Sequence, residues 1–140
     1  IIRTGIVLDK NDGALMRMLL PYRLFVGGPF GDGKQWYSWI HLKDEAAAIR
    51  YLLENDQAQG IFNLTAPHPL TNAEFGKALA RVMKRPSWLP LPGFVFRVMF
   101  GEVAKVVLDG QRVIPQRLQE LGFRFQFPDV ESAFRDILEK

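Results

Sequence analysis

The sequence contains no cysteine and only two histidines among its 140 residues. The lack of cysteine excludes disulfide bonds, thiolate metal ligands and cysteine nucleophiles. His41 and His68 have no acidic residue or second histidine at the spacing expected of metal ligands, so we predict no metal site. No serine lies in a nucleophile elbow. These absences indicate that the chain carries part of an active site rather than a complete one.

Long apolar runs and strong charge of one sign are also missing. The most apolar stretch, Phe94–Leu108, is too short to span a membrane and is interrupted by Arg97, Glu102 and Lys105. The formal net charge is only +3. The one basic cluster is typical of a solvated helix face rather than a nucleic-acid surface: Lys77, Arg81, Lys84 and Arg85. We therefore expect no nucleic-acid or membrane partner and, given the lack of cysteine, a cytoplasmic protein.

Segments of β-type composition alternate with helical patterns in the first half of the chain. Ile1–Leu8 is β-branched and apolar, which predicts a buried strand. The charge within this opening run argues against a signal peptide, so we interpret it as a strand already under way in a longer protein. Further extended segments are expected at Arg23–Val26, Trp36–Ile40 and Gly60–Thr65. The second half is predicted to be mainly helical.

Capping residues and prolines mark the helix boundaries. Asn11–Gly13 is a turn signal, and Ala14–Leu20 is a helix candidate that Pro21 is expected to stop. Asp44 is expected to cap a helix over Glu45–Asn55 rather than to act as a general base.

The later helices are predicted in the same way. Thr71 and Glu74 form a capping box at the start of a helix that Pro86 ends. Phe94–Leu108 carries one narrow polar stripe, so we expect a helix that is buried on most sides or lies in an interface. Pro115 and Gly122 mark the start and end of one helix. The alternating Phe123, Phe125 and Phe127 predict a short strand or an extended arm, and Asp129 is expected to cap the last helix.

Four glycines lie within seven residues from Gly27 to Gly33. A Walker loop requires Ser or Thr after its Gly-Lys, whereas Gln35 follows Lys34. A dinucleotide fingerprint requires a different glycine spacing and a helix immediately afterwards. The pattern therefore predicts a turn between extended segments. His41, just beyond it, either contacts a substrate or is a hydrogen-bonded structural histidine.

Several stretches, taken in order, resemble a single family. They are RTGIVL (3–8), GGPFGDGKQWYSWIH with Asp44, GIFNLTAPHPLTNAEF (60–75), RPSWLPLP (85–92), FGEVAKVVLDGQRVIPQRL (100–118) and LGFRFQFP (121–128). They resemble the C-terminal half of NAD-dependent epimerase/dehydratase-like proteins of the extended short-chain dehydrogenase/reductase superfamily. The branch in question is described as nucleoside-diphosphate-sugar epimerase or SulA-like and ends in a domain of unknown function, DUF1731. The resemblance covers essentially the whole chain.

This resemblance implies an α/β fold: the C-terminal lobe of an extended Rossmann-type protein, with a few short strands and a mainly helical second half. Residues 1–85 would end the epimerase domain and form a substrate-side lobe, and residues 86–140 would form a helical DUF1731-like domain. NAD or NADP would serve the full-length protein. The resemblance places the cofactor beside Thr4, Gly5, Ile6 and Val7, and a small-molecule substrate, such as a nucleotide sugar, beside Lys34, Gln35, Tyr37 and His41.

The catalytic motifs of that superfamily are missing from this sequence. None of the three tyrosines has a lysine four positions later, and the glycine-rich fingerprint is absent. In the superfamily this tyrosine is the general acid/base and the lysine lowers its pKa. We therefore assign no catalytic residue and expect the chain alone to be inactive.

Tyr37 departs from the pattern that sugar-nucleotide epimerases show. They carry an Arg four residues before the His of their I-H-x-x-D motif, and the alignment of His41 and Asp44 places Tyr37 there. A phenol does not replace the guanidinium fork on a diphosphate. Lys34 either compensates or is a solvated loop lysine.

Three functional hypotheses follow. The first is the substrate-side part of an NAD(P)-dependent epimerase or oxidoreductase. The second is a non-catalytic interaction protein linked to cell division, which the SulA-like branch implies. The third is a small binding module that folds alone. Self-association is expected through Phe94–Leu108 or through an exposed Ile1–Leu8.

Overall fold

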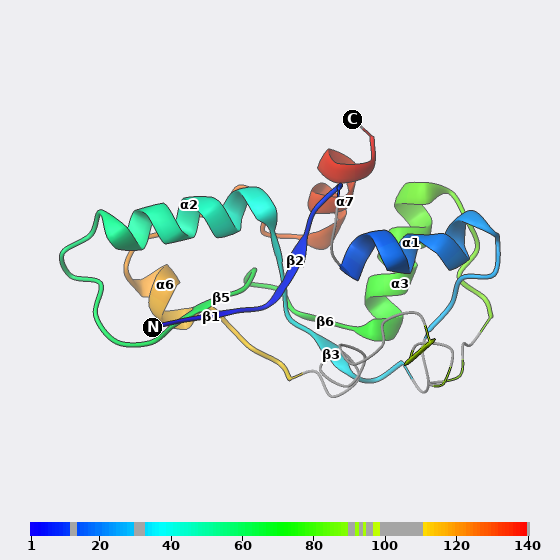
Figure 1. Cartoon of the computed structure of the whole chain (residues 1–140), viewed down its shortest axis with the longest axis horizontal. Coiled ribbons are helices and arrows are strands. Elements are labelled where there is room, and N and C mark those ends of the chain that lie inside the picture. The colour runs from blue at the N-terminus through cyan, green and yellow to red at the C-terminus, as the bar shows by residue number, and fades with distance from the viewer. Residues whose placement is uncertain are drawn as a thin grey trace.

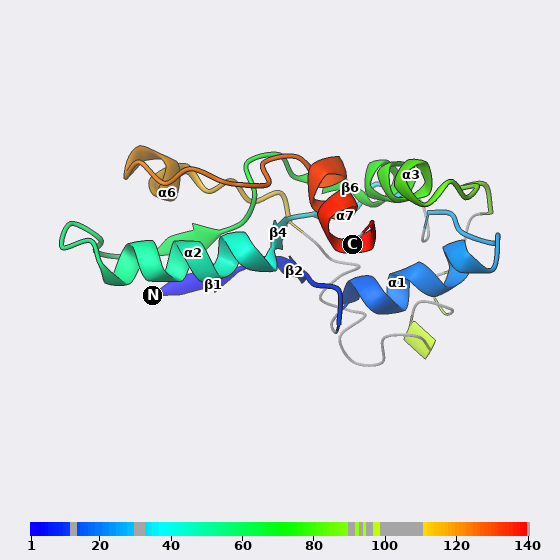
Figure 2. The ribbon, with the colours of Figure 1, turned by 90° about the horizontal axis from the view of Figure 1, so that it is seen from above.

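The computed structural model describes residues 1–11, 14–29, 33–89, 92, 94, 97–98 and 111–139. Figure 1 shows an elongated molecule. At one end, strands β1 (Ile2–Thr4) and β5 (Phe62–Leu64) run beneath helix α2 (Leu42–Leu53), beside the short helix α6 (Gln116–Glu120). Three helices gather toward the other end: α1 (Ala14–Arg23), α3 (Asn72–Met83) and α7 (Val130–Leu138). Seen from above, α7 lies between α2 and the α1–α3 pair (Figure 2).

The described strands are short and form three pairs. β1 pairs in parallel with β5, so that Ile2 lies opposite Phe62. β2 (Ile6–Leu8) pairs in parallel with β4 (Trp39–His41), and β3 (Trp36–Tyr37) pairs antiparallel with β6 (Leu70–Thr71). Parallel strands joined through helices confirm the predicted α/β class.

Two hydrophobic cores lie on opposite sides of β4, because successive side chains of a strand point to opposite faces. Trp39 packs into the first core with residues of α1, α3 and α7, such as Leu15, Phe75 and Phe134. Ile40 packs into the second core, which α2, β5 and α6 complete. The three-residue strand therefore joins the two ends of the molecule.

The prediction of a single strand over Ile1–Leu8 is wrong. The stretch forms two strands that change partner at Gly5. A Cβ on Gly5 would lie 2.5 Å from the carbonyl oxygen of Ser38, so only glycine allows this close approach. Ile1 and Ile2 are exposed, whereas Leu8 is fully buried.

The helix expected to stop before Pro21 continues to Arg23 with the proline inside it. The prediction of a strand over Arg23–Val26 is also wrong. The N–H of Phe25 donates to Tyr22 and that of Val26 to Pro21, at 3.1 and 2.9 Å. These bonds close the helix end in a Schellman motif, which turns the chain where the composition suggested a strand.

Most of the remaining boundaries agree with the structure. The Thr71 capping box is present, and Asp129 caps α7. Gly122, with φ 104°, follows α6, and Pro115 stands at the N-cap one residue before that helix. Residues 123–127 are irregular and form no strand.

Two expectations fall partly outside the described residues. Of the turn at Asn11–Gly13, only Asn11 is described. Of the helix over Phe94–Leu108, only Phe94, Arg97 and Val98 are described, and all three are exposed. No helix in the described ranges is long and apolar enough to cross a bilayer.

Candidate functional site

The expected cofactor-facing residues lie along β1 and β2. Thr4 is exposed at the end of β1, and its hydroxyl donates to Oε1 of Glu45 at 2.9 Å. Gly5 connects the two strands, and its N–H donates to the carbonyl of Leu64 at 3.2 Å. Ile6 and Val7 are half-buried in β2, opposite Trp39 and Ile40. Only the Thr4 end of this group therefore faces solvent.

Glu45 lies in the first turn of α2, and only one of its two carboxylate oxygens has a hydrogen-bond partner among the described residues. Its Oε2 atom is buried and has no hydrogen-bond partner in the part of the chain that is described. Burial raises the pKa of Glu45, although the hydrogen bond from Thr4 lowers it in part. A buried acceptor without a donor is costly, so this oxygen is suited to a donor from a group that binds beside Thr4.

Tyr37, expected in the substrate site, lies in the core. It is 1% exposed and packs edge-on against Phe75 with ring centroids 5.1 Å apart. Its hydroxyl accepts from Nδ2 of Asn72 at 3.0 Å. Burial raises the pKa of the Tyr37 phenol, so the side chain stays neutral. Tyr37 thus occupies the motif position of the epimerase arginine without offering a charge.

Lys34 and Gln35 lie at the start of the β3 segment, near α3. Lys34 is exposed and Gln35 is half-buried. The carbonyl of Gln35 accepts the N–H of Asn72 at 2.8 Å, and that of Gly33 accepts the N–H of Ala73 at 3.0 Å. The end of the glycine loop therefore holds the first turn of α3 in place.

Residues from the C-terminal part lie against this same segment, and sequence reasoning missed them. Ser38 Oγ donates to the carbonyl of Gln111 at 2.6 Å and accepts the N–H of Val113 at 2.9 Å. Between these two contacts, the guanidinium of Arg112 lies 5.5 Å from the ring centre of Trp36. Gln111–Val113 belong to a stretch quoted above for the family resemblance, but no spacing rule singles out Arg112.

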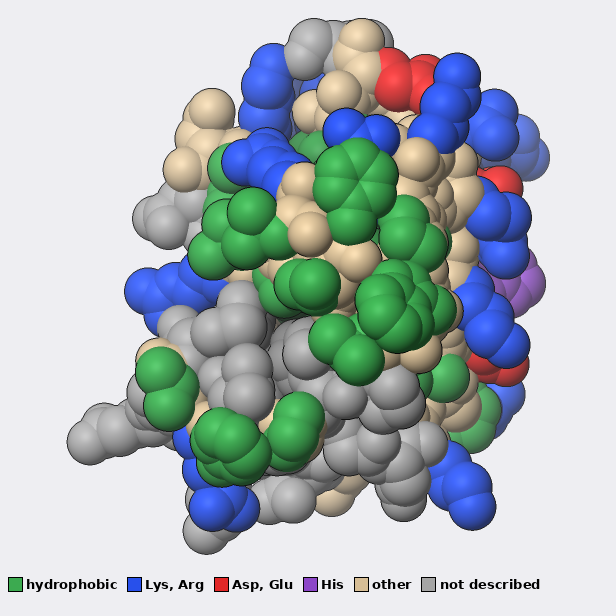
Figure 3. Space-filling view, turned by 90° about the vertical axis from the view of Figure 1, so that its right-hand side faces the viewer, with side chains coloured by type: hydrophobic (Ala, Val, Ile, Leu, Met, Phe, Trp, Pro, Cys, Tyr) green, Lys and Arg blue, Asp and Glu red, His purple; other side chains and the backbone are tan. Residues whose placement is uncertain are grey.

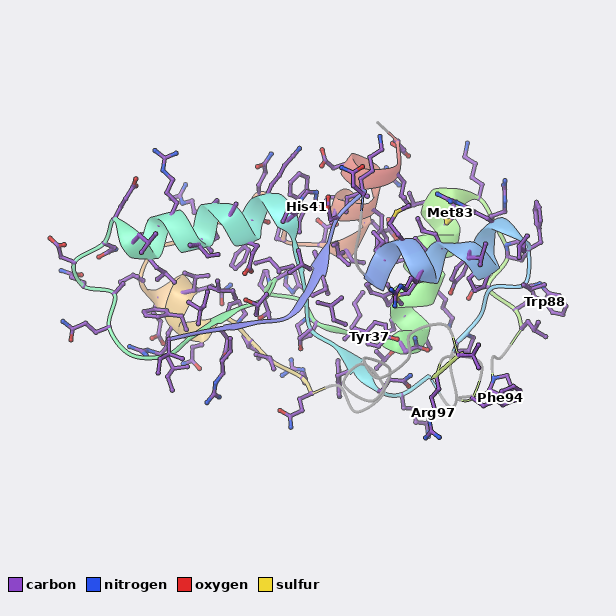
Figure 4. All side chains as sticks on the ribbon, in the orientation of Figure 1. Tyr37, His41, Met83, Trp88, Phe94 and Arg97 are labelled. Carbon is purple, nitrogen blue, oxygen red and sulfur yellow. The ribbon has the colours of Figure 1, made fainter. Side chains whose placement is uncertain are left out.

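His41 is 3% exposed and takes part in a contact between α2 and α7 rather than facing solvent. Its Nδ1 accepts the N–H of Lys43 at 3.0 Å, which makes His41, and not Asp44, the N-cap of α2. Its Nε2 lies 2.9 Å from Oδ2 of Asp136, and its ring stacks on Phe127 at 4.1 Å. Figure 4 shows His41 at the start of α2, well separated from Tyr37 near α3.

Burial lowers the pKa of His41, while the hydrogen bond and the charge of Asp136 raise it in part. Lys43 Nζ also contacts Asp136, at 3.1 Å, and the charge of Lys43 lowers the pKa of His41 further. The cluster is therefore stable with a neutral imidazole. Of the two roles left open for His41, the structure provides contacts for the structural one.

Asp44 was expected to cap α2, and this prediction is wrong. The residue is 1% exposed, and its two oxygens accept the N–H groups of Gln126 and Phe127 at 2.8 and 2.9 Å. A carboxylate with both oxygens accepting from backbone is a structural anchor.

The expected substrate residues thus separate into two groups. Lys34 and Gln35 lie at the edge beside Trp36 and Arg112, whereas Tyr37 and His41 are buried. No group of three or more His, Asp or Glu suited to a metal ion exists among the described residues. The exposed guanidinium of Arg112 can hold an anion.

Comparison with known proteins indicates the class of fold. A family model described as a domain of unknown function (DUF1731) matches residues 91–137. A nucleoside-diphosphate sugar epimerase structure from Corynebacterium glutamicum is 28% identical, with a TM-score of 0.72 over 98% of this chain and 25% of that one. The described architecture therefore matches the C-terminal portion of Rossmann-type epimerase structures.

The particular relatives are epimerase family proteins. An Arabidopsis thaliana protein named epimerase family protein SDR39U1 homolog, chloroplastic, is 45% identical over 99% of this chain, and the Mus musculus SDR39U1 protein is 42% identical over 99%. The human SDR39U1 structure, solved with NADPH, is 39% identical with a TM-score of 0.91 over 99% of this chain. Over 99% of its length the chain is similar to the C-terminal half of these epimerase family proteins.

The chain spans less than half the length of these relatives. It covers 40% of the Arabidopsis protein, 47% of the mouse protein and 48% of the human chain. The name of the Arabidopsis relative places that protein in the chloroplast. The cytoplasmic location expected here stays a prediction.

Proposed function

We propose that this chain is the substrate-side lobe of an NAD(P)-dependent epimerase or oxidoreductase. The observation that supports the proposal most strongly is the match, with a TM-score of 0.91 over 99% of the chain, to a human epimerase family protein solved with NADPH. The sequence has no glycine-rich fingerprint and no Tyr-x-x-x-Lys pair. On this proposal the chain contributes binding groups, and the catalytic groups come from the part of the protein that carries those motifs.

The residues on β1 fit one side of a dinucleotide site. Thr4 is exposed on a strand that pairs on one side only among the described strands, and the unpartnered Oε2 of Glu45 is a ready acceptor in the adjoining α2 turn. A nicotinamide cofactor supplies hydride transfer when bound. In this arrangement Thr4 orients Glu45, Glu45 accepts a donor, and Gly5 lets the strand pass close to Ser38. Ile6 and Val7 support the strand from the core side.

The substrate on this proposal is an anion of the nucleoside-diphosphate-sugar class, and Arg112 replaces the arginine that Tyr37 does not supply. The backbone on either side of Arg112 is fixed by Ser38, and its guanidinium is exposed. No carboxylate pairs with Arg112 in the described ranges, so its charge is available to a phosphate. Lys34 and Gln35 flank the same edge, and His41 acts as a positioning residue through α2.

Titration of the full-length protein with NADPH and NADH, followed by fluorescence, tests the cofactor. We expect saturable binding of at least one of them. UDP-glucose is then titrated into the cofactor complex. Arg112→Gln is expected to weaken UDP-glucose binding about tenfold, the loss of roughly one charge-assisted contact. The matched control, Arg124→Gln, removes another exposed guanidinium and is expected to leave binding unchanged.

The outcomes separate the two parts of the proposal. A full-length protein that binds neither dinucleotide contradicts the oxidoreductase assignment. Cofactor binding with UDP-glucose affinity unchanged in Arg112→Gln contradicts only the anion contact. The division into residues 1–85 and 86–140 is also part of the proposal. Ser38, His41 and Asp44 each form a hydrogen bond with a residue on the far side of this boundary, so the two parts pack together. The cell-division alternative has no support among the relatives named above.

A further inference from the structure

Helices α1 and α3 both end in a residue with a left-handed backbone that is not glycine. Phe25 has φ 63° after α1, and Lys84 has φ 57° after α3. The N–H of Arg85 donates to Ala80 at 3.0 Å, which closes α3 as Val26 closes α1. Glycine normally occupies this position because a side chain strains it. Here the side chains at the two strained positions are the phenyl ring of Phe25 and the ammonium group of Lys84.

The two helix ends are held against each other. Nε1 of Trp88 donates to the carbonyl of Phe25 at 3.0 Å, and the backbone N–H of Trp88 donates to Gly27 at 2.9 Å. A Cβ on Gly28 would lie 1.9 Å from the carbonyl oxygen of Leu89. The guanidinium of Arg85 lies 4.5 Å from the ring centre of Phe25. Phe25, Arg85 and Trp88 are therefore fixed before any partner arrives.

The apolar side chains around this junction are exposed, and we call them the end surface. Figure 3 shows hydrophobic side chains gathered on this face, and Figure 4 shows Trp88 at the extremity of the molecule. Trp88 is 62% exposed, Leu24 62% and Phe25 55%. The end surface consists of Leu20, Leu24, Phe25, Val26 and Trp88. Clustered exposed apolar side chains of this size mark interaction sites.

The charged residues of the two segments that form the end surface are all basic. Arg23 and Lys84 are exposed and Arg85 is half-buried, and Nε of Arg85 has no hydrogen-bond partner in the described part of the chain. Residues 14–29 and 75–89 contain no aspartate or glutamate. Lys84 and Arg85 of the basic cluster thus adjoin an apolar surface, whereas Arg81 pairs with Glu131 of α7.

We propose that the end surface is a docking site for a partner protein that presents an acidic segment with apolar side chains. The positive charge opposes a second copy of the same surface and favours an acidic occupant. The preorganised Phe25–Arg85–Trp88 group has the composition of a protein hot spot, and its rigidity lowers the entropy cost of docking. A lipid surface requires no such fixed geometry. This proposal does not depend on the enzymatic assignment.

Peptides selected from a random 12-residue display library against the immobilised full-length protein test this proposal, with affinities measured by calorimetry. We expect the binders to be enriched in Asp and Glu next to Leu, Phe or Trp. Trp88→Ala and Phe25→Gly are expected to weaken binding at least tenfold, and Arg85→Gln about fivefold. Phe25→Gly is the informative variant, because glycine relieves the left-handed strain and keeps the fold.

Two control variants alter comparable side chains elsewhere: Leu53→Ala, an 83% exposed leucine on α2, and Arg124→Gln. Both are expected to bind the selected peptides as the natural chain does. The proposal is overturned if no binders emerge, if they lack acidic residues, or if Phe25→Gly binds them unchanged. Flotation with vesicles of phosphatidylserine and phosphatidylcholine provides the last arm. If the protein binds vesicles but no peptide, and the same variants lose vesicle binding, the surface is assigned to lipid and the proposal is overturned.

Discussion

The carboxylate of Asp44 accepts the backbone N–H of Phe127 at 2.9 Å, a contact between residues 83 positions apart. Its other oxygen accepts the N–H of Gln126 at 2.8 Å. The first turn of α2 thus holds the segment that leads into α7. His41, three residues earlier, holds α7 itself through Asp136. The spacing of this His and Asp therefore has a structural explanation that requires no substrate.

Asp44→Asn is expected to lower the free energy of unfolding by about 2 kcal/mol. The amide nitrogen cannot accept, so one of the two buried N–H donors loses its partner. Urea denaturation followed by circular dichroism measures the change. Glu54→Gln, at the exposed C-cap residue of the same helix, is expected to cost less than about 0.5 kcal/mol. Equal losses in the two variants would show that Asp44 is not an anchor.

The stability of the protein is expected to fall as the pH drops below about 6.5, the ordinary pKa of histidine. Burial lowers the pKa of His41 in the folded state, so the unfolded chain takes up this proton first. The stabilisation from neutral His41 is therefore complete above that pH and is lost as the solution becomes more acidic.

His41→Asn isolates this contribution, since asparagine still accepts the Lys43 N–H as an N-cap. We expect the free energy of unfolding, measured by urea denaturation, to fall less between pH 7.5 and pH 5.0 in the variant than in the natural sequence. An identical pH dependence in both proteins argues that other groups are responsible.

Tyr37→Phe is expected to cost about 1 kcal/mol through the lost hydrogen bond from Asn72. Binding of UDP-glucose to the cofactor complex is expected to stay unchanged, because Tyr37 is buried. Tyr37→Arg restores the residue type of sugar-nucleotide epimerases but places a charge in the core, and a loss of about 3 kcal/mol or more is expected. Calorimetry of the same preparations measures both quantities. Tighter UDP-glucose binding by a folded Tyr37→Arg protein contradicts the structural role.

Arg117→Lys is expected to lower the free energy of unfolding by about 1–2 kcal/mol. The guanidinium donates to the carbonyls of Ile61 and Gln59, at 2.8 and 2.6 Å, and lies 4.7 Å from the ring centre of Phe62. A single ammonium cannot reproduce the fork and the stacking together. Thermal unfolding compares this variant with Arg124→Lys, for which we expect a change within about 0.5 kcal/mol.

Local features were predicted well from the sequence. The Thr71 capping box and the Asp129 cap depend on neighbours within three residues, and the structure has both. The strand over Arg23–Val26 failed because composition does not encode the hydrogen bond from Val26 back to Pro21. The α/β class followed from the alternation of segments, which is a property of the whole chain.

Long-range contacts were the part that sequence reasoning did not reach. Asp44 and His41 were assigned the roles that their immediate neighbours suggested, whereas their partners lie beyond residue 125. Arg112 had no motif of its own, and only the Ser38 contacts place it beside Trp36. A single sequence carries no signal for such pairs, since their proximity is a result of folding.

The anchors on the first turn of α2 also bear on the order in which the chain folds. The partners of His41 and Asp44 lie 82 to 95 residues further along the chain. Until that segment has docked, a carboxylate and an imidazole remain at the site of an unfinished core. Closing such distant pairs is slow, because the loop entropy is lost before the contacts form. The first core, which includes Phe127, Val130 and Phe134, therefore reaches its final packing only after this distant segment has docked on α2.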